Sequence, residues 1–196
     1  MSHLGLSSNV QPFGPSATPM SVSVDHGLVE RAQSGDRDAF AELLVAEARW
    51  AYGTAHAITL SRADAEDAFQ EATIRAWRDM SKLREPAAWR GWFRRIIVRA
   101  AIDVGRGRTN VREIPVRAWD VQADSVEVYA ERDRIARFLR ELSLDERALI
   151  ALRFGRDLTI ADAAELLGCP LGTAKSRLHR ALTKLRRALE SEADEY

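Results

Sequence analysis

The chain has 196 residues, 46% of them hydrophobic, and its 29 basic and 29 acidic side chains give a formal net charge of zero. This composition suits one or two compact soluble domains and excludes a membrane-spanning segment. A single cysteine, Cys169, excludes an intramolecular disulfide and a multi-cysteine metal site, which is consistent with a reducing cytosol.

The opening segment, residues 1–24, is rich in Ser, Pro and Gly. It has no basic start followed by an apolar run, so we expect a disordered tail rather than a secretory signal. Beyond it, apolar residues recur at helical spacing and nowhere alternate with polar residues for long enough to form a strand. The fold is therefore predicted to be all-α.

Two helices are predicted over the first half of the chain. One has an apolar stripe that starts at Phe40, and it should end in the turn at residues 59–62. Ser61 followed by Asp64 has the spacing of a capping box, so we expect the next helix to begin there. Pro86 stops its continuation, because proline lacks the amide hydrogen that a helix interior requires.

A third helix is predicted to carry the apolar residues between Phe93 and Val104, until Gly105 and Gly107 interrupt it. Helical periodicity then disappears over residues 108–125. We interpret that segment as a flexible linker between two small helical domains.

Residues 126–190 are predicted to form the second helical domain. Ser143 is followed three residues later by a glutamate, a capping box that opens one helix. Thr159 is expected to cap the next helix, which Gly168 ends. After a short turn, the hydroxyl of Thr173 is expected to cap the last helix. This pair of helices has the proportions of a helix-turn-helix, whose second helix lies in the major groove of DNA.

Charge is unevenly distributed along the chain. Eight arginines and only two acids lie from Arg84 to Arg112, and six basic residues with no acid lie from Leu171 to Arg187. Two separate basic segments predict two contacts with one polyanion.

The polar face of the last helix is one candidate for DNA contact. Opposite the leucines it presents Ser176, His179, Arg180 and Thr183, with Lys175 and Arg177 flanking them. These side chains suit base edges and phosphates. The alternative is an amphipathic helix with a solvated basic face.

The predicted helix that begins near Ser61 has an acidic face. Along one side it carries Asp64, Asp67, Gln70, Glu71 and Ile74. An acidic face that contains an apolar residue can dock a basic partner helix, and the alternative is an ordinary solvated surface.

Aromatic and basic residues are interleaved in the segment WRGWFRR, residues 89–95. This combination can stack unpaired bases while holding the phosphate backbone. Phe93 belongs to the apolar stripe, whereas Trp89 and Trp92 are open to either core packing or base contact, with Trp89 the better candidate for bases. The opposite face carries a track of cations, Arg95, Arg99 and Arg106.

Nothing in the sequence supports catalysis. The four histidines are scattered, and we find neither a Gly-rich phosphate loop nor the spacing of metal ligands. We therefore predict that the chain is not an enzyme and has no cofactor or metal site.

Four segments, in order, resemble the extracytoplasmic function (ECF) group of bacterial RNA polymerase sigma factors. LVERAQSGDRDAFAELL is similar to the group's opening helices, DAEDAFQEATIRAWRDM to region 2.2, and WRGWFRRIIVRAAIDVGRGR to regions 2.3 and 2.4. LSLDERALIALRFGRDLTIADAAELLGCPLGTAKSRLHRALTKLRRAL is similar to region 4. The resemblance implies a region 2 domain over residues 25–107, a linker over 108–125, a region 4 domain over 126–190 and a short acidic tail over 191–196, with no further regulatory domain.

The resemblance also implies a function. The chain would be an alternative sigma factor of the cytoplasm that binds core RNA polymerase and directs promoter-specific transcription initiation. Contact with the clamp helices of the largest polymerase subunit is implied for Asp64, Asp67, Gln70, Glu71 and Ile74. Recognition of the single-stranded upstream-ten element is implied for Trp89, Trp92, Arg95, Arg99 and Asp103. Recognition of the duplex upstream-thirty-five element is implied for Thr173, Lys175, Ser176, Arg177, His179 and Arg180.

Other partners implied by the resemblance are the polymerase flap and an anti-sigma protein, without membrane insertion. The chain departs from the family where Arg99 replaces the usual Asn and where Gly105 and Gly107 break a basic run. Two other functions are considered. One is a dimeric helix-turn-helix repressor, which would have no use for the acidic face or the aromatic and basic helix. The other is an adaptor that binds polymerase without selecting promoters.

Overall fold

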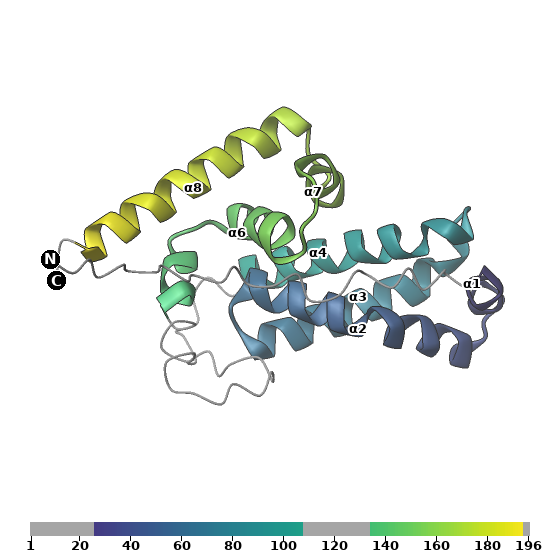
Figure 1. The fold of residues 1–196 in the computed structure, drawn as a ribbon. Coiled ribbons are helices and arrows are strands. Elements are labelled where there is room, and N and C mark those ends of the chain that lie inside the picture. The colour runs from purple at the N-terminus through teal and green to yellow at the C-terminus, as the bar shows by residue number, and fades with distance from the viewer. Residues whose placement is uncertain (1–25, 108–133, 194–196) are drawn as a thin grey trace, which may run out of the picture.

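The computed structural model describes residues 26–107 and 134–193, and every regular element within these two ranges is helical (Figure 1). The predicted all-α fold is confirmed there. The tail expected over residues 1–24 and the linker expected over 108–125 lie outside the described residues.

The N-terminal region is a group of four helices with two short 3-10 turns between the last two. The elements are α1 (His26–Gln33), α2 (Arg37–Thr59), α3 (Arg62–Asp79), η1 (Met80–Lys82), η2 (Pro86–Ala88) and α4 (Trp89–Gly107). The buried side of α3 consists of alanines at positions 65, 68, 72 and 76. Because alanine is small, α2 and α4 can both pack closely on α3, and the larger buried side chains come from α2 and α4.

The C-terminal region begins with a helical segment at residues 134–140. It continues through α6 (Leu144–Ile150), the π-helical turn η3 (Ala151–Gly155), α7 (Ile160–Leu167) and α8 (Leu171–Ala193). The two helices of the predicted helix-turn-helix are α7 and α8, and they pack against each other and against α6.

Most of the predicted helix starts and stops are confirmed. The Ser61 hydroxyl accepts a hydrogen bond from the Asp64 amide at 3.3 Å, and Ser143 forms both halves of its capping box with Glu146. Thr159 caps α7, and Gly168 ends it with a φ of 65°, in the left-handed region that favours glycine.

Two expectations about helix ends are wrong. Thr173 is not a cap, because α8 begins at Leu171 directly after Pro170, whose carbonyl accepts from the Ala174 amide at 3.0 Å. Nor does Gly105 interrupt α4, which continues to Gly107. A Cβ at position 105 would lie 2.7 Å from Leu144 Cδ2, so this glycine lets α6 approach α4 closely.

The two regions pack against each other, an arrangement that the sequence did not predict. Contacts join α4 to α6 and α7 and join α2 to α6, and one apolar core runs through both regions. Arg147 donates to the Ile58 carbonyl at 2.9 Å, and Arg156 donates to the Trp50 carbonyl at 2.9 Å. In the described ranges, no helix is long and apolar enough to cross a membrane.

Candidate functional site

The acidic face of α3 lies on the side of the helix opposite its buried alanines. Gln70 and Ile74 are exposed, and Asp64, Asp67 and Glu71 are partly exposed. Ile74 is 61% exposed, which places a large apolar side chain among the acids. All five predicted residues are therefore on one accessible surface, and this surface combines negative charge with an apolar contact.

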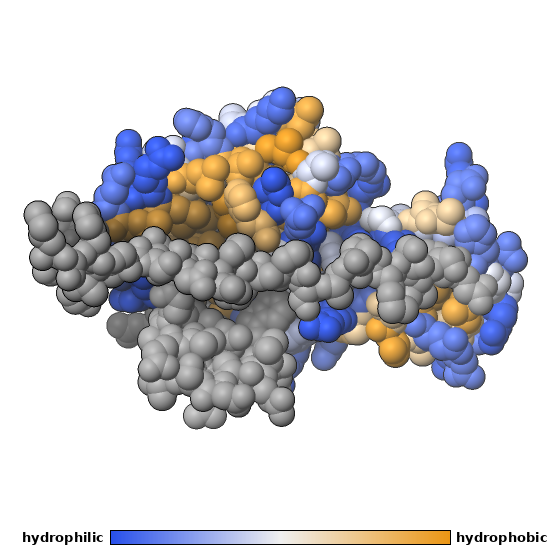
Figure 2. All heavy atoms as spheres, viewed as in Figure 1, coloured by the Kyte–Doolittle hydropathy of each residue, from blue (hydrophilic) through white to orange (hydrophobic). Residues whose placement is uncertain are grey.

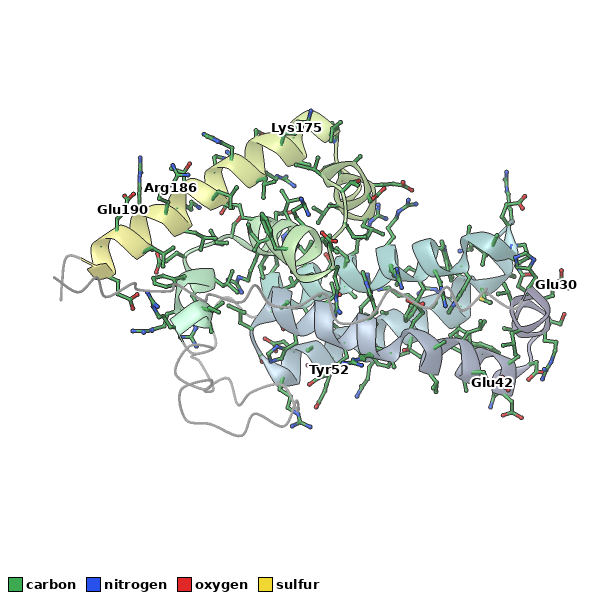
Figure 3. The ribbon with its side chains drawn as sticks, viewed as in Figure 1. Glu30, Glu42, Tyr52, Lys175, Arg186 and Glu190 are labelled. Carbon is green, nitrogen blue, oxygen red and sulfur yellow. The ribbon has the colours of Figure 1, made fainter. Side chains whose placement is uncertain are left out.

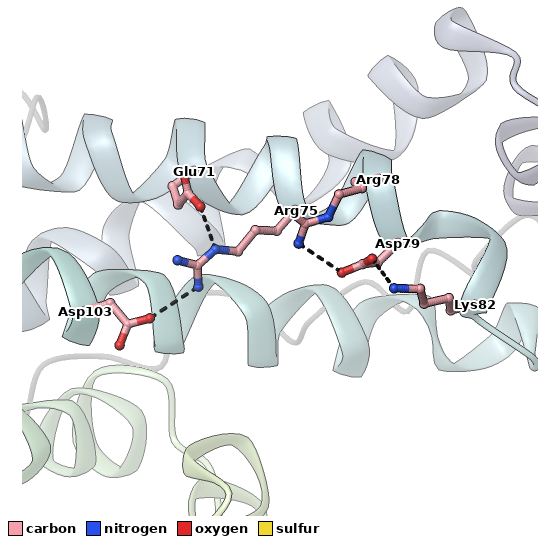
Figure 4. Close-up of polar contacts among 6 residues, drawn as sticks. All are labelled: Glu71, Arg75, Arg78, Asp79, Lys82 and Asp103. Atoms are coloured by element: carbon pink, nitrogen blue, oxygen red, sulfur yellow. Dashed lines mark hydrogen bonds and ion pairs between the residues drawn. The ribbon is translucent and has the colours of Figure 1, made fainter.

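Arg75 connects this acidic face to α4. Its Nε donates to Glu71 Oε1 at 2.6 Å, and its Nη1 donates to Asp103 Oδ2 at 3.2 Å (Figure 4). The hydrogen bond to Glu71 contributes most to a raised pKa of Arg75, and Asp103 adds to it. Asp103 thus lies beside the acidic face as well as on α4. Nothing in the sequence pattern singled out Arg75.

Trp89 is buried, so its predicted role in stacking on bases is wrong in this structure. The residue is 1% exposed, and its ring is stacked on Phe93 with 5.2 Å between ring centroids. Phe40 from α2 meets the same ring edge-on at 6.0 Å. Trp92, which is partly exposed, is the aromatic side chain of this segment that remains accessible.

Two arginines of α4 form ion pairs with a buried glutamate. Glu47 in α2 is 1% exposed, and it accepts from Arg94 at 2.7 Å and pairs with Arg90 at 3.1 Å. The Arg94 guanidinium also lies over the Trp50 ring, 4.5 Å from its centroid. These contacts secure α4 on α2, a structural role that the sequence analysis missed because Glu47 comes from a distant segment.

The remaining polar stripe of α4 faces the C-terminal region. Arg95 pairs with Glu165 of α7 at 2.7 Å, and Arg106 pairs with Asp145 of α6 at 2.8 Å. The Arg99 guanidinium lies against Gly168, since a Cβ there would be 2.7 Å from Arg99 Nη2. The predicted single-strand contacts other than Trp89 therefore form one stripe. Arg99 and Asp103 are exposed on it, whereas Arg95 is paired with α7.

The first half of α8 has an accessible polar face. Lys175, Ser176, His179 and Arg180 are exposed, whereas Ala174 and Ala181 are buried on the opposite side. Figure 3 shows Lys175 and Arg186 along the outer edge of α8, directed away from the other helices.

Two further predicted residues of α8 have internal contacts. Arg177 is only partly exposed and pairs with Asp145 at 3.4 Å. Thr173 is also partly exposed, and its carbonyl accepts from the Ser176 hydroxyl at 3.0 Å. The sequence therefore located this face correctly, but it did not distinguish Arg177 from its exposed neighbours.

An apolar groove of about 840 Å³ runs beneath α8. Its apolar lining includes four large side chains that are more than 40% exposed, Ile135, Phe154, Leu182 and Leu189. Figure 2 shows apolar surface in orange under the hydrophilic edge of α8. An exposed apolar surface of this extent is typical of a protein-binding site.

Comparisons with known proteins identify the family. The family model described as Sigma-70 region 2 matches residues 43–110, and the model described as Sigma-70, region 4 matches residues 138–187. The chain is 32% identical over 165 residues to the ECF RNA polymerase sigma factor SigM of Mycobacterium tuberculosis, covering 84% of each protein. It is 33% identical to the ECF RNA polymerase sigma-E factor of Haemophilus influenzae, covering 80% of this chain and 90% of the relative.

Two solved structures share the fold. CnrH in complex with the cytosolic domain of CnrY aligns with a TM-score of 0.63 at 23% identity, over 86% of this chain and 98% of that one. The sigma factor RpoE of Bartonella quintana, in complex with the anti-sigma factor NepR, aligns with a TM-score of 0.61 at 24% identity, over 77% and 96%.

Proposed function

The chain belongs to the ECF RNA polymerase sigma factors, and we propose which of its surfaces bind core polymerase and which bind promoter DNA. As an alternative sigma factor it directs initiation, and it is not an enzyme. The acidic face of α3 binds the clamp helices of core RNA polymerase. The stripe of α4 binds the opened upstream-ten element, and the first half of α8 binds the duplex upstream-thirty-five element. The chain acts in the cytoplasm, where these partners are.

The observation that carries this assignment is the exposed polar face of α8. Lys175, Ser176, His179 and Arg180 are all accessible at the N-terminal half of the second helix of a helix-turn-helix. In that motif, the N-terminal residues of the second helix reach base edges in the major groove. A bidentate arginine contact with guanine supplies about 1–3 kcal/mol of discrimination between bases.

The stripe of α4 supports the second contact in a different way. Trp92 offers an aromatic surface, and Arg95, Arg99 and Arg106 offer cations at helical spacing. Arg95 and Arg106 are paired with acids of α7 and α6 in this arrangement. Phosphates would have to replace those acids, so binding of the upstream-ten strand breaks the pairs of Arg95 with Glu165 and of Arg106 with Asp145.

The apolar groove beneath α8 is the proposed binding site for protein partners of the C-terminal region. We propose that the polymerase flap binds there, since the groove exposes apolar side chains that a partner helix could cover. An anti-sigma protein, the class of partner in the complex solved for the RpoE relative, would then compete with the flap for the same surface.

The proposed function is tested by in vitro transcription with core polymerase on a library of genomic fragments. The wild-type chain should select a defined set of promoters, and Arg180→Ala should alter the preferred base at one position of the upstream-thirty-five element. Arg186→Ala is the matched control, because Arg186 is also exposed on α8 but lies beyond its first half. Transcripts without a shared promoter sequence would contradict the proposal and favour the adaptor that does not select promoters.

A dimeric repressor is the other function to distinguish. It would bind duplex DNA without polymerase, whereas the proposed sigma factor should form a stable complex with purified core. Reversing the charge of Asp67 and Glu71 to Lys should abolish that complex and leave the helical content unchanged, because the solvent-exposed pair of Glu71 with Arg75 contributes at most about 1 kcal/mol to stability. Undiminished core binding by this variant would remove α3 from the docking surface.

A further inference from the structure

Arg75 holds two acidic side chains that the proposed function assigns to different partners. It donates to Glu71 at 2.6 Å and to Asp103 at 3.2 Å. Glu71 belongs to the face assigned to the polymerase, whereas Asp103 belongs to the stripe of α4 assigned to the upstream-ten element. Figure 4 shows the Arg75 guanidinium between the two carboxylates, which come from neighbouring helices.

This contact can rearrange when a partner binds. The side chains of Arg75, Glu71 and Asp103 are 34%, 44% and 52% exposed, so solvent and partners reach all three. A guanidinium has five N–H donors in a planar fork. The Arg75 guanidinium can therefore change from donating to two carboxylates to donating two parallel hydrogen bonds to one of them.

We propose that Arg75 is a positioning residue that couples polymerase docking at Glu71 to promoter reading by Asp103. The inference rests on the proposed function. When a basic side chain of the polymerase pairs with Glu71, it competes with Arg75 for that carboxylate. Arg75 then holds Asp103 alone, which fixes the orientation of the Asp103 carboxylate and offsets its charge as the phosphates of the promoter strand approach.

The coupling must be reciprocal, because each ligand changes the affinity for the other by the same factor. Its size is limited by exposure, since ion pairs in contact with solvent have small interaction energies. We expect a change of about two- to fivefold in affinity.

The same helix provides a matched control. Arg78 pairs with Asp79 at 3.4 Å, and Asp79 also accepts from Lys82 at 2.6 Å. The three members of this second cluster come from one short segment, so it does not bridge α3 and α4 (Figure 4). Arg78→Gln therefore removes an arginine and its ion pair without touching the Glu71 and Asp103 contacts.

The test measures the affinity of core polymerase for the full-length chain with and without a saturating oligonucleotide. The oligonucleotide is a single strand carrying the upstream-ten sequence that the holoenzyme selects from a random pool. For wild type and Arg78→Gln, the oligonucleotide should tighten core binding about two- to fivefold. For Arg75→Gln, the ratio of core affinity with the oligonucleotide to core affinity without it should fall to about one. Arg75→Lys should restore part of it, because an ammonium keeps the charge but lacks the planar fork.

Full coupling in Arg75→Gln, or equal loss in Arg78→Gln, would overturn the proposal. If Arg75→Gln binds core too weakly to measure, Asp103→Asn provides the second measurement, since it keeps the pair of Arg75 and Glu71 but should also abolish the ratio. A wild-type ratio of one, with normal core binding and promoter selection, would overturn the coupling and leave the proposed function intact. Absence of core binding or selection would instead contradict the proposed function itself.

Discussion

The two basic helices, α4 and α8, have similar charge in the sequence and very different surroundings in the structure. In α4, Arg90 and Arg94 are held by Glu47, and Arg95 is held by Glu165. In the first half of α8, Lys175 and Arg180 are exposed on the outer side of the molecule. The local density of positive charge therefore does not show which cations can bind a polyanion, because acids from distant segments can occupy them first.

The comparison also separates two kinds of arginine within α4. Glu47 is buried, so its partners Arg90 and Arg94 act in holding the helix in place. Glu165 and Asp145 are partners at the surface, so Arg95 and Arg106 can exchange them for phosphates at little cost. Substitutions at these side chains and their partners test this distinction.

The alanine variants of Trp89 and Trp92 should show the largest difference in the free energy of unfolding. Trp89→Ala removes a fully buried ring, so we expect a loss of about 3–5 kcal/mol in the free energy of unfolding, measured by urea denaturation. Trp92→Ala should cost less, because Trp92 is partly exposed. It should instead slow open-complex formation on a duplex promoter and spare transcription from a template with a pre-opened bubble. Wild-type stability of Trp89→Ala would contradict the assignment of this ring to the core.

Glu47→Gln should also destabilise the chain. It leaves Arg90 and Arg94 without their buried carboxylate, and we expect a loss of about 3 kcal/mol in the free energy of unfolding. Glu42→Gln, at an exposed position on the same helix, should change stability by less than about 0.5 kcal/mol. If the two variants unfold at the same urea concentration, Arg90 and Arg94 do not depend on Glu47.

Glu146 makes the stability of the C-terminal region depend on pH. Burial opposes ionisation of Glu146, but hydrogen bonds from Lys184 and Ser143 outweigh it and hold the pKa below its ordinary value of 4.5. A carboxyl with a lowered pKa stabilises the fold above the unfolded-state pKa, and this contribution is lost as the pH falls through the folded-state value. At pH 7, Glu146→Gln should therefore be about 1 kcal/mol less stable than wild type.

The difference between Glu146→Gln and wild type should shrink steadily as the pH falls below 4.5, because the carboxyl binds a proton first in the unfolded chain and only at lower pH in the folded one. Urea denaturation at a series of pH values measures it. A difference that stays constant down to strongly acidic pH would show that the Glu146 charge contributes nothing to stability.

Glu165→Gln should have the smallest effect on stability and a measurable effect on DNA binding. It releases Arg95 from an exposed ion pair, so the free energy of unfolding should change by less than about 1 kcal/mol. Affinity for a single-stranded upstream-ten oligonucleotide should rise about two- to fivefold, measured by fluorescence anisotropy. Glu190→Gln removes the same charge from an exposed position on α8 and is the control for net charge (Figure 3). Equal gains in both variants would show a general charge effect and no release of Arg95.

Local signals in the sequence were enough to predict the helices, most of their ends and the family. Caps such as Ser61, Ser143 and Thr159 act within three residues, and Gly168 ends α7 through its own backbone conformation. Apolar periodicity likewise depends on neighbours along the chain. These signals are local, so they can be read before any tertiary contact is known.

Which side chains are accessible to a partner depends on tertiary contacts, which the sequence did not reveal. Trp89 is buried partly by Phe40 of α2, and Gly105 lies inside α4 at a point where a side chain would collide with Leu144. The partners of Arg94 and Arg95 lie 47 and 70 residues away in the sequence. Such contacts depend on how helices pack, and no periodicity within one helix specifies which distant carboxylate will meet an arginine. The accessible faces of α4 and α8 could therefore be distinguished only after the two regions were seen together.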